Sequence, residues 1–212
     1  MTPPAPTKIV CVGRNYVGHA RELGNEVPER PLIFLKPVSS LIGDGDAIVL
    51  PPQSERVEHE GEIGVVIGKR AKNVTESDAL SVVAGYVPVN DVTARDLQKL
   101  DGQWTRAKGF DTFCPVGRMA PADGIDWLQL EVVCRVNGTE RQRGKASEMA
   151  FGIPTLIAFI TAVMTLEPGD IIATGTPEGI GPLQPGDRVE VELSGLNAVQ
   201  NTVRAAQQEN RA

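Results

Sequence analysis

The sequence predicts a β-rich α+β domain, and three observations support this fold class. Short apolar segments typical of strands recur along the chain, glycine and proline turns separate them, and only two or three short segments have helical spacing. The 212 residues include 22 glycines and 16 prolines, which suits many short strands. No internal repeat, long linker or low-complexity segment appears, so we expect a Pro-rich tail at residues 1–7 and one domain at 8–212.

The first half of the chain alternates between strands and short helices. It begins with a buried strand at 8–13, followed by a helix at 15–24 whose apolar residues have helical spacing and whose natural stop is Gly24. The next expected elements are an apolar segment at 31–37, a turn at 43–46 leading into AIVLPP, a strand at 61–69, and a segment at 76–90 that passes from helical polarity into a β-rich run.

The second half begins with a helix and then becomes richer in strands. Thr93 is placed to cap the helix TARDLQKL, and Asp96 stands where a capping box has its acid. Asn137-Gly138 predicts a hairpin. A further helix is expected to begin near Pro154, because proline is tolerated in a first turn. The segments EPGDII and QPGDRVEVEL each predict a turn followed by a strand.

Composition and charge argue against several classes of protein. The net charge is −6 and no dense run of Lys or Arg occurs, which disfavours a nucleic-acid or anionic-membrane surface. The three cysteines are far apart and form no C-x-x-C motif, so a reduced protein is favoured over a disulfide scaffold. The N-terminus lacks the apolar segment of a secretory signal, and the longest apolar run is too short to span a bilayer. We therefore expect a soluble cytoplasmic protein.

Glutamates occupy every second position in RVEHEGEIGVVIGK, at Glu58, Glu60 and Glu62. Alternate residues of a strand point to one face about 7 Å apart, and two carboxylates at that distance repel by about 2 kcal/mol at an effective dielectric of roughly 20. A divalent cation such as Mg²⁺ would relieve the repulsion, with Asp91 placed to supply a third ligand. The alternative is an ordinary solvated face. His59 points to the opposite face by alternation, so it is expected to be packed or hydrogen-bonded.

His19 and Glu22 stand three residues apart on the first expected helix, so their side chains share one face. A carboxylate bound to one imidazole nitrogen fixes the tautomer and raises the basicity of the other nitrogen, which a water-activating base requires. Flanking glycines would let this segment move as a lid. The alternative is a surface pair without a catalytic role.

Three further segments offer groups that could bind a substrate. Lys108 lies among aromatic residues in WTRAKGFDTFCP, where a partly buried ammonium could hold a carboxylate or stabilise an enolate. Arg95 and Gln98 share a helical face just after Asp91. The segment TGTPEGIG at 174–181 offers backbone N–H groups and hydroxyls for an anion, but it lacks the lysine of a P-loop. The alternatives are a solvated lysine, an exposed helical face and a plain turn.

Taken together and in this order, these segments resemble the fumarylacetoacetate hydrolase family. The matching stretches are GRNYVGHARELG, PLIFLKP, VEHEGEIGVVIGK, GYVPVNDVTARDLQ, WTRAKGFDTFCPVG, VNGTERQRG and ATGTPEGIGPLQPGD, which together cover roughly residues 9–204. The resemblance implies the family's mixed β-sandwich roll with a few short helices around a metal site. It also implies the short, single-domain bacterial type and a homodimer.

The resemblance implies a role for each carboxylate of the acidic strand. Glu60, Glu62 and Asp91 match the family's three ligands for Mg²⁺, Mn²⁺ or Ca²⁺. Glu58 matches no ligand, and we expect it at the solvated mouth of the strand.

The resemblance also implies catalytic and substrate-contacting residues. His19 and Glu22 match the lid dyad of the acylpyruvase-like members, and Lys108 matches the family's active-site lysine. The positions implied to contact substrate are Arg95, Gln98, Gly175 and Thr176.

The activity implied by the resemblance is hydrolysis of a C–C bond in a 3-acylpyruvate, such as acetylpyruvate or fumarylpyruvate. The metal would bind the 2-oxo acid, His19 oriented by Glu22 would activate water, and Lys108 would help to stabilise a pyruvate enolate. The same site could instead decarboxylate oxaloacetate or isomerise a diacid of the 2-hydroxyhepta-2,4-diene-1,7-dioate type. A non-catalytic, Ca²⁺-stabilised binding module is the alternative from another class.

Overall fold

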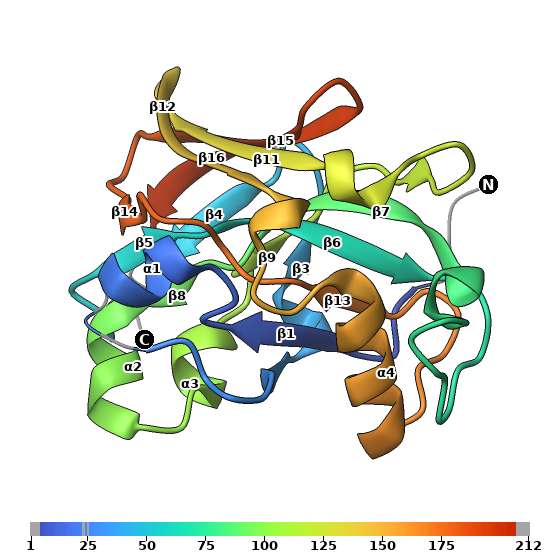
Figure 1. Ribbon diagram of the computed structural model, residues 1–212. Helices are drawn as coiled ribbons and strands as arrows, with labels where there is room; N and C mark the ends of the chain where they lie inside the picture. The colour runs from blue at the N-terminus through green and yellow to red at the C-terminus, as the bar shows by residue number, and fades with distance from the viewer. Residues whose placement is uncertain (1–4, 23, 25, 207–212) are drawn as a thin grey trace.

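Two β-sheets pack against each other, and short helices lie around them (Figure 1). The computed structural model describes residues 5–22, 24 and 26–206. In Figure 1 the five-stranded sheet lies above the six-stranded sheet, and three strands of the first contact two strands of the second. The strand-rich α+β fold predicted from the sequence is therefore confirmed. Residues 1–4 of the predicted tail and residues 207–212 lie outside the described part of the chain.

The six-stranded sheet has the order β10-β7-β6-β13-β1-β2. Its strands are Ile9–Gly13 (β1), Leu32–Lys36 (β2), Gly61–Ile67 (β6), Val83–Asn90 (β7), Ala120–Pro121 (β10) and Ile171–Ala173 (β13). Only β1 and β13 pair in parallel. Every residue of β6 is buried, which explains its continuous apolar run, since a strand covered on both faces has no solvated side for alternating polar residues.

The five-stranded sheet has the order β12-β11-β15-β16-β4. Its strands are Ala47–Leu50 (β4), Glu131–Val136 (β11), Thr139–Lys145 (β12), Arg188–Leu193 (β15) and Asn197–Ala205 (β16). The predicted hairpin is confirmed: Asn137 and Gly138 join β11 to β12, and both have positive φ values, as a tight hairpin turn requires. The two predicted turn-then-strand units are β13 and β15.

Two small sheets connect the segments that carry the candidate residues. The three-stranded sheet joins Val57–His59 (β5), Thr93–Ala94 (β8) and Gly181–Pro182 (β14), and the two-stranded sheet joins Leu41–Ile42 (β3) to Cys114–Pro115 (β9). In the first, the acidic strand lies between the segment that leads into α2 and the end of TGTPEGIG. This sheet therefore brings together three parts of the chain that are far apart in sequence.

The described residues contain four α-helices, one more than the two or three expected. They are Val17–Glu22 (α1), Arg95–Asp101 (α2), Thr105–Lys108 (α3) and Ile153–Val163 (α4), and short 3₁₀ turns cover Val38–Ser40, Ala79–Val82, Trp127–Gln129 and Ala146–Glu148. α4 has Pro154 in its first turn, as predicted. Gly24 follows α1 with φ +67°, so the predicted stop is confirmed, whereas Leu23 lies outside the described residues.

The capping box predicted at Thr93 and Asp96 is wrong. Thr93 lies in β8 and its hydroxyl donates to the Asp91 carbonyl at 2.8 Å, while α2 begins at Arg95 without a side-chain cap. The Asp96 carboxylate instead accepts from the Ser54 hydroxyl at 2.6 Å and from the Glu55 N–H at 2.9 Å. Long-range contacts with the segment before β5 have replaced the local motif.

Most of the core lies between the two large sheets, and a smaller apolar cluster covers the outer face of the six-stranded sheet. Cys11, Cys114 and Cys134 are buried and unpaired. In the described residues, no helix is long and apolar enough to cross a membrane.

Candidate active site

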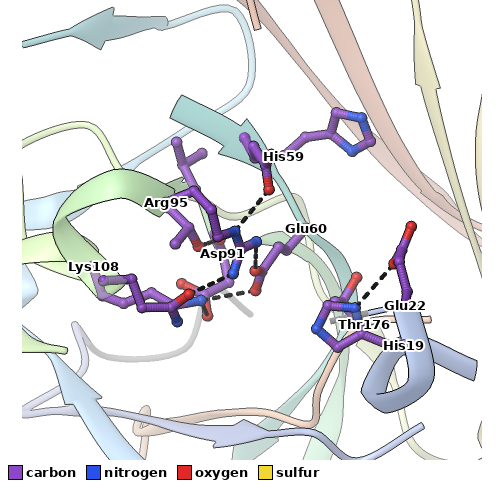
Figure 2. Close-up of polar contacts among 12 residues, drawn as sticks. His19, Glu22, His59, Glu60, Asp91, Arg95, Lys108 and Thr176 are labelled. Carbon is purple, nitrogen blue, oxygen red and sulfur yellow. Dashed lines mark hydrogen bonds and ion pairs between the residues drawn. The ribbon is translucent and has the colours of Figure 1, made fainter. Parts of the chain in front are cut away.

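A single cavity of about 340 Å³ gathers most of the predicted site residues. It opens where β6 and the ends of β1 and β7 approach α1, α2 and α3 (Figure 2). The predicted residues that line it are His19, Glu60, Glu62, Asp91, Arg95, Gln98, Lys108 and Thr176. Segments from four distant parts of the chain thus meet at one place.

The three predicted metal ligands converge at the inner end of this cavity. Glu60 lies between β5 and β6, Glu62 lies on β6, and Asp91 follows β7. The Asp91 N–H donates to the Glu60 carbonyl at 2.8 Å, which continues the β6–β7 pairing. Each of the three buried side chains offers one oxygen, and these oxygens lie within 4.8 Å of one another.

Cationic side chains contact two of these carboxylates. The Lys108 Nζ donates to Glu60 Oε2 at 2.7 Å and to Asp91 Oδ2 at 2.6 Å, and Arg95 forms an ion pair with Glu60 (Figure 2). Burial alone would raise the pKa of Glu60, but the charges of Lys108 and Arg95 hold it well below its usual range. Burial likewise would lower the pKa of Lys108, but Asp91 and Glu60 raise it above its ordinary value. The ammonium therefore stays protonated.

Glu62 differs from its two neighbours. Its Oε2 accepts from the Gly175 N–H at 2.8 Å, and no Lys or Arg in the described part of the chain pairs with it. Burial raises the pKa of Glu62 well above its usual value, and the charges of Asp91 and Glu60 raise it further. A buried carboxylate that faces two others and lacks a cation is a suitable ligand for a divalent metal ion. The donor set therefore fits Mg²⁺ or Mn²⁺, which prefer carboxylate oxygens.

The expectation that Glu58 lies at a solvated strand mouth is wrong. Its side chain is buried, and its carboxylate accepts from Arg95 Nε at 2.7 Å and from Arg56 Nε at 2.6 Å. Glu58 pairs with Thr93 across the three-stranded sheet, and this pairing places it beside the start of α2. Two guanidinium groups thus compensate a buried charge that sequence alternation assigned to solvent.

His59 lies on the opposite face of the acidic strand, as alternation predicted. Its ring points away from Glu60 and Asp91 (Figure 2), and its Nδ1 lies 3.0 Å from the Gln142 Oε1. Burial lowers the pKa of His59, so this imidazole is neutral near pH 7.

The predicted dyad is formed on α1. His19 Nδ1 lies 3.3 Å from Glu22 Oε2, and the His19 side chain is 5% exposed (Figure 2). Glu22 also accepts from the Gly179 N–H at 3.1 Å, so it joins α1 to the loop after β13. The imidazole borders the same cavity as the three carboxylates, and its Nδ1 is the nitrogen that Glu22 contacts.

The hydrogen-bond donors of the loop after β13 bind other residues of the site, so they are not free to bind an anion. The Gly175 N–H binds Glu62, and the Thr176 hydroxyl donates to the Gly61 carbonyl at 2.8 Å and accepts from Gln142 Nε2 at 2.7 Å. Gly175 has φ +102°, and a Cβ there would lie 2.7 Å from the Asn15 Cβ, so only glycine fits. Substrate contact by Gly175 and Thr176 stays a prediction, and only Thr176 lines the cavity.

Arg95 and Gln98 share a face of α2, as predicted. The Arg95 Nη1 donates to Gln98 Oε1 at 2.6 Å, and both residues border the cavity. Because Arg95 also holds Glu58 and Glu60, its guanidinium is fixed in position. Contact of this pair with substrate likewise remains a prediction.

Sequence reasoning missed three residues of the site. Lys36 at the end of β2 is buried, and its Nζ donates to Asp91 Oδ1 at 2.6 Å and to the Val92 carbonyl at 3.1 Å. Its signal was a lysine directly after the apolar run LIFL. Gln142 had no comparable signal in the exposed hairpin TERQRGK, and Arg14 stood unremarked in the turn after β1.

Comparison with known proteins supports the same reading of the chain. The family model described as "Fumarylacetoacetate (FAA) hydrolase C-terminal" matches residues 8–204. A mitochondrial oxaloacetate tautomerase of Arabidopsis thaliana is 47% identical over 199 residues, covering 92% of this chain and 89% of that protein. A mitochondrial oxaloacetate decarboxylase of Dictyostelium discoideum is 44% identical over 196 residues, covering 90% of each chain.

A solved structure shows the same fold at lower identity. Fumarylpyruvate hydrolase from Pseudomonas aeruginosa, solved in complex with Mn²⁺ and pyruvate, is 28% identical to this chain with a TM-score of 0.89. The match covers 97% of this chain and 99% of that one. With a family match over nearly the whole length and relatives above 40% identity, this chain belongs to the fumarylacetoacetate hydrolase family.

Proposed function

We propose that this protein is a divalent-metal-dependent enzyme that hydrolyses a C–C bond in 3-acylpyruvates through a pyruvate enolate. The observation that supports this most strongly is the arrangement of one cavity: three converging carboxylates and Lys108 at its inner end, and the His19–Glu22 pair at its border. Family members named above act on oxaloacetate or fumarylpyruvate, which are both 2-oxo acids with a second carbonyl group nearby.

The residues of the cavity can each perform a defined part of the hydrolysis. Glu60, Glu62 and Asp91 would hold Mg²⁺ or Mn²⁺, which when bound supplies Lewis-acid charge beside the 2-oxo acid. Lys108 is kept protonated by its two carboxylate partners, so its ammonium group can donate a hydrogen bond to the developing enolate oxygen. Arg95 is held rigidly enough to position a carboxylate of the substrate.

His19 can move the protons that the reaction requires. With Glu22 at Nδ1, Nε2 takes a proton from water, and the water oxygen forms a bond to the acyl carbonyl carbon of the substrate. The C–C bond then breaks, and its electron pair passes into the pyruvate enolate. Return of the proton from His19 to the enolate carbon gives pyruvate and a carboxylic acid, so one water is consumed for each bond that is broken.

Oxaloacetate chemistry is the second candidate, because the relatives at 47% and 44% identity are named for it. Decarboxylation of oxaloacetate produces the same pyruvate enolate without attack by water. Tautomerisation moves one proton between carbon and the enol oxygen, and His19 can carry that proton. These reactions share the inner end of the cavity with hydrolysis and differ in the use of water.

A substrate panel separates these activities. Protein loaded with Mg²⁺ or Mn²⁺ is incubated with acetylpyruvate, fumarylpyruvate and oxaloacetate, enol absorbance is followed, and products are identified by NMR. We expect hydrolysis of an acylpyruvate, with complete loss of activity in a chelator. Turnover of oxaloacetate alone would favour the second candidate, and no turnover of any substrate by the metal-loaded protein would favour a binding module.

The variant His19→Gln tests whether the protein is a catalyst or a metal-stabilised binding module. We expect a loss of about 10²- to 10⁴-fold in kcat, as is typical for removal of a general base, with metal binding retained. Arg21→Gln is the matched control, because Arg21 is exposed on the same helix and does not line the cavity. Full activity of His19→Gln would contradict the assignment of the base.

A further inference from the structure

Arg14 occupies an unusual place at the border of the active-site cavity. It follows β1 directly, lines the cavity, and adopts φ +58°, a left-handed conformation that non-glycine residues rarely take. Among the described residues no carboxylate pairs with its guanidinium, whereas Lys36, Arg95 and Lys108 all have carboxylate partners. A half-buried cation at the edge of a cavity is therefore free to bind an anion.

The backbone around Arg14 is held firmly by its neighbour Asn15. The Asn15 side chain is fully buried, donates from Nδ2 to the Thr174 carbonyl at 2.8 Å and to the Phe151 carbonyl at 3.0 Å, and accepts from the Phe151 N–H at 2.8 Å. The Asn15 carbonyl also accepts from the Ala150 N–H at 2.8 Å. The surrounding structure thus maintains the left-handed turn and fixes where the Arg14 side chain begins.

The charges at the inner end of the cavity balance without Arg14. In the described part of the chain, the carboxylates there have cationic partners other than Arg14: Arg56 and Arg95 for Glu58, Arg95 and Lys108 for Glu60, and Lys36 and Lys108 for Asp91. Glu62 would face the divalent cation, and the inner carboxylate of the substrate would bind beside that cation. An additional cation at the border therefore has no partner when a monocarboxylate is bound, and it gains one when the substrate has a second carboxylate.

Lys99 is the other cation at this border, but it is less well placed to select a ligand. It is exposed on α2, where a flexible side chain loses more conformational entropy on binding. Arg14 is partly buried and offers a planar fork that matches a carboxylate in two hydrogen bonds. Phe34 and Trp104, whose ring centroids lie 5.2 Å apart, form an apolar wall of the same cavity that suits a short carbon chain.

We propose that Arg14 binds the distal carboxylate of a dicarboxylic 2-oxo acid and thereby makes the site prefer diacids to monoacids. The inference rests on the proposed function, in which a 2-oxo acid binds at the inner carboxylate cluster. It concerns the opposite end of the substrate, so it can fail while the proposed function holds.

The test measures binding, so that it does not depend on which reaction is catalysed. Titration calorimetry on the metal-loaded protein compares pyruvate, which has no second carboxylate, with 2-oxoglutarate and 2-oxoadipate. These two diacids carry their second carboxylate at different distances from the 2-oxo group. We expect wild-type protein to bind the better diacid about 10- to 100-fold more tightly than pyruvate, the range for a charge-assisted bidentate pair. Arg14→Asn should abolish this preference and change the affinity for pyruvate less than about 3-fold.

The variants are chosen to preserve the turn. Asparagine tolerates positive φ, and Arg14→Gly is a second neutral variant with the same tolerance should Arg14→Asn fold poorly. Arg14→Lys keeps the charge without the fork and should recover part of the preference. Arg21→Gln removes an exposed positive charge nearby in sequence and should leave the preference unchanged.

Four results would overturn the inference. Equal weakening of pyruvate and both diacids in the neutral variants would make Arg14 a structural residue. An unchanged preference for diacids would assign it to another group. If wild-type protein bound no 2-oxo acid and turned none over, the proposed function itself would fail together with the inference. Turnover of 2-oxo acids by wild-type protein without a preference for diacids would refute the role of Arg14 alone.

Discussion

Replacement of Glu62 by glutamine should have opposite effects on stability in the absence and presence of metal. Without metal, Glu62 faces the carboxylates of Glu60 and Asp91 within 4.8 Å. At an effective dielectric of roughly 20, one such contact between charges costs about 3 kcal/mol. Glutamine removes this repulsion, its Oε1 can still accept from the Gly175 N–H, and its amide N–H groups can donate to the neighbouring carboxylates.

The pH dependence of stability sets an upper limit on the effect of Glu62 at pH 7. Because burial and neighbouring charges raise the pKa of Glu62 in the folded chain, the folded chain binds more protons than the unfolded chain above about pH 4.5. Stability of the metal-free protein therefore falls as pH rises through this range, by about 1.4 kcal/mol per unit, or at most about 3 kcal/mol between pH 4.5 and 7.

The assay is thermal unfolding of wild-type protein and Glu62→Gln in a chelator and in excess Mg²⁺ or Mn²⁺. In the chelator at pH 7 we expect the variant to be more stable by about 2–3 kcal/mol, or roughly 5–10 °C for a chain of this length. A metal ion at 100 times its Kd should stabilise wild-type protein by about 2.7 kcal/mol and the variant far less. Glu29→Gln removes one exposed carboxylate and serves as control.

Two outcomes would refute this reasoning. If Glu62→Gln were less stable than wild-type protein in the chelator between pH 6 and 8, the carboxylate would not be under electrostatic strain. If the variant retained the whole metal-dependent rise in Tm, Glu62 would not be a ligand.

Three further predictions concern groups around the site. In Gly18→Ala the new Cβ would lie 1.9 Å from Glu178 Oε2 and would displace the helix that carries His19, so kcat/KM should fall about 10-fold. Addition of Glu178→Ala removes the clash and should restore kcat/KM. A double variant no better than Gly18→Ala would argue against this contact. Gln142→Leu leaves the Gly61 N–H and the Pro177 carbonyl without the Gln142 amide as hydrogen-bond partner, so Tm should fall by about 5–15 °C, and a fall below 3 °C would contradict the role of that amide. Burial lowers the pKa of His59, so below about pH 6.5 the unfolded chain binds a proton that the folded chain does not, and stability is lost as pH falls. His59→Gln should therefore reduce the dependence of the unfolding free energy on pH by up to about 1.4 kcal/mol per unit, measured by denaturant titrations between pH 5 and 7. An unchanged pH dependence would contradict this role of His59.

Local patterns in the sequence predicted the parts of the fold and site that local physics determines. Alternation in the acidic strand correctly separated His59 from Glu60 and Glu62, because the side-chain period of a strand is fixed by its backbone. Asn137-Gly138 similarly predicted its hairpin, since the tight turn needs two residues with positive φ.

Features that depend on pairing between distant segments were missed or assigned wrongly. Glu58 is buried because β5 pairs with β8 and brings Arg95 alongside, a contact across 37 residues. Lys36 reaches Asp91 across 55 residues. From the local sequence, each of these residues is expected to be an ordinary surface charge. Its burial is stabilised only by the charged partner that the tertiary fold brings next to it. Asp91 was predicted as a third ligand from its place at the end of an apolar strand, and the family resemblance, which includes such long-range information implicitly, implied the same role.

On the proposed function, the distribution of cations would let one site serve several reactions of 2-oxo acids. Glu60 and Asp91 keep their cations permanently, because Lys108 and Arg95 are buried with them, whereas Glu62 has none in the described chain. The inner end of the cavity thus suits a cation that binds from solution, and with that cation bound it would stabilise an enolate whichever bond is broken or proton is removed.

If the proposed function holds, groups elsewhere in the cavity would decide between hydrolysis, decarboxylation and tautomerisation. The group that can activate water, His19, lies on a six-residue helix that is fastened through Glu22 to the Gly179 N–H. Disruption of that fastening, by Glu22→Gln, should reduce hydrolysis of an acylpyruvate more than decarboxylation of oxaloacetate, since only the first needs water activated by an oriented imidazole. An equal loss in both reactions would show instead that α1 acts at the enolate itself.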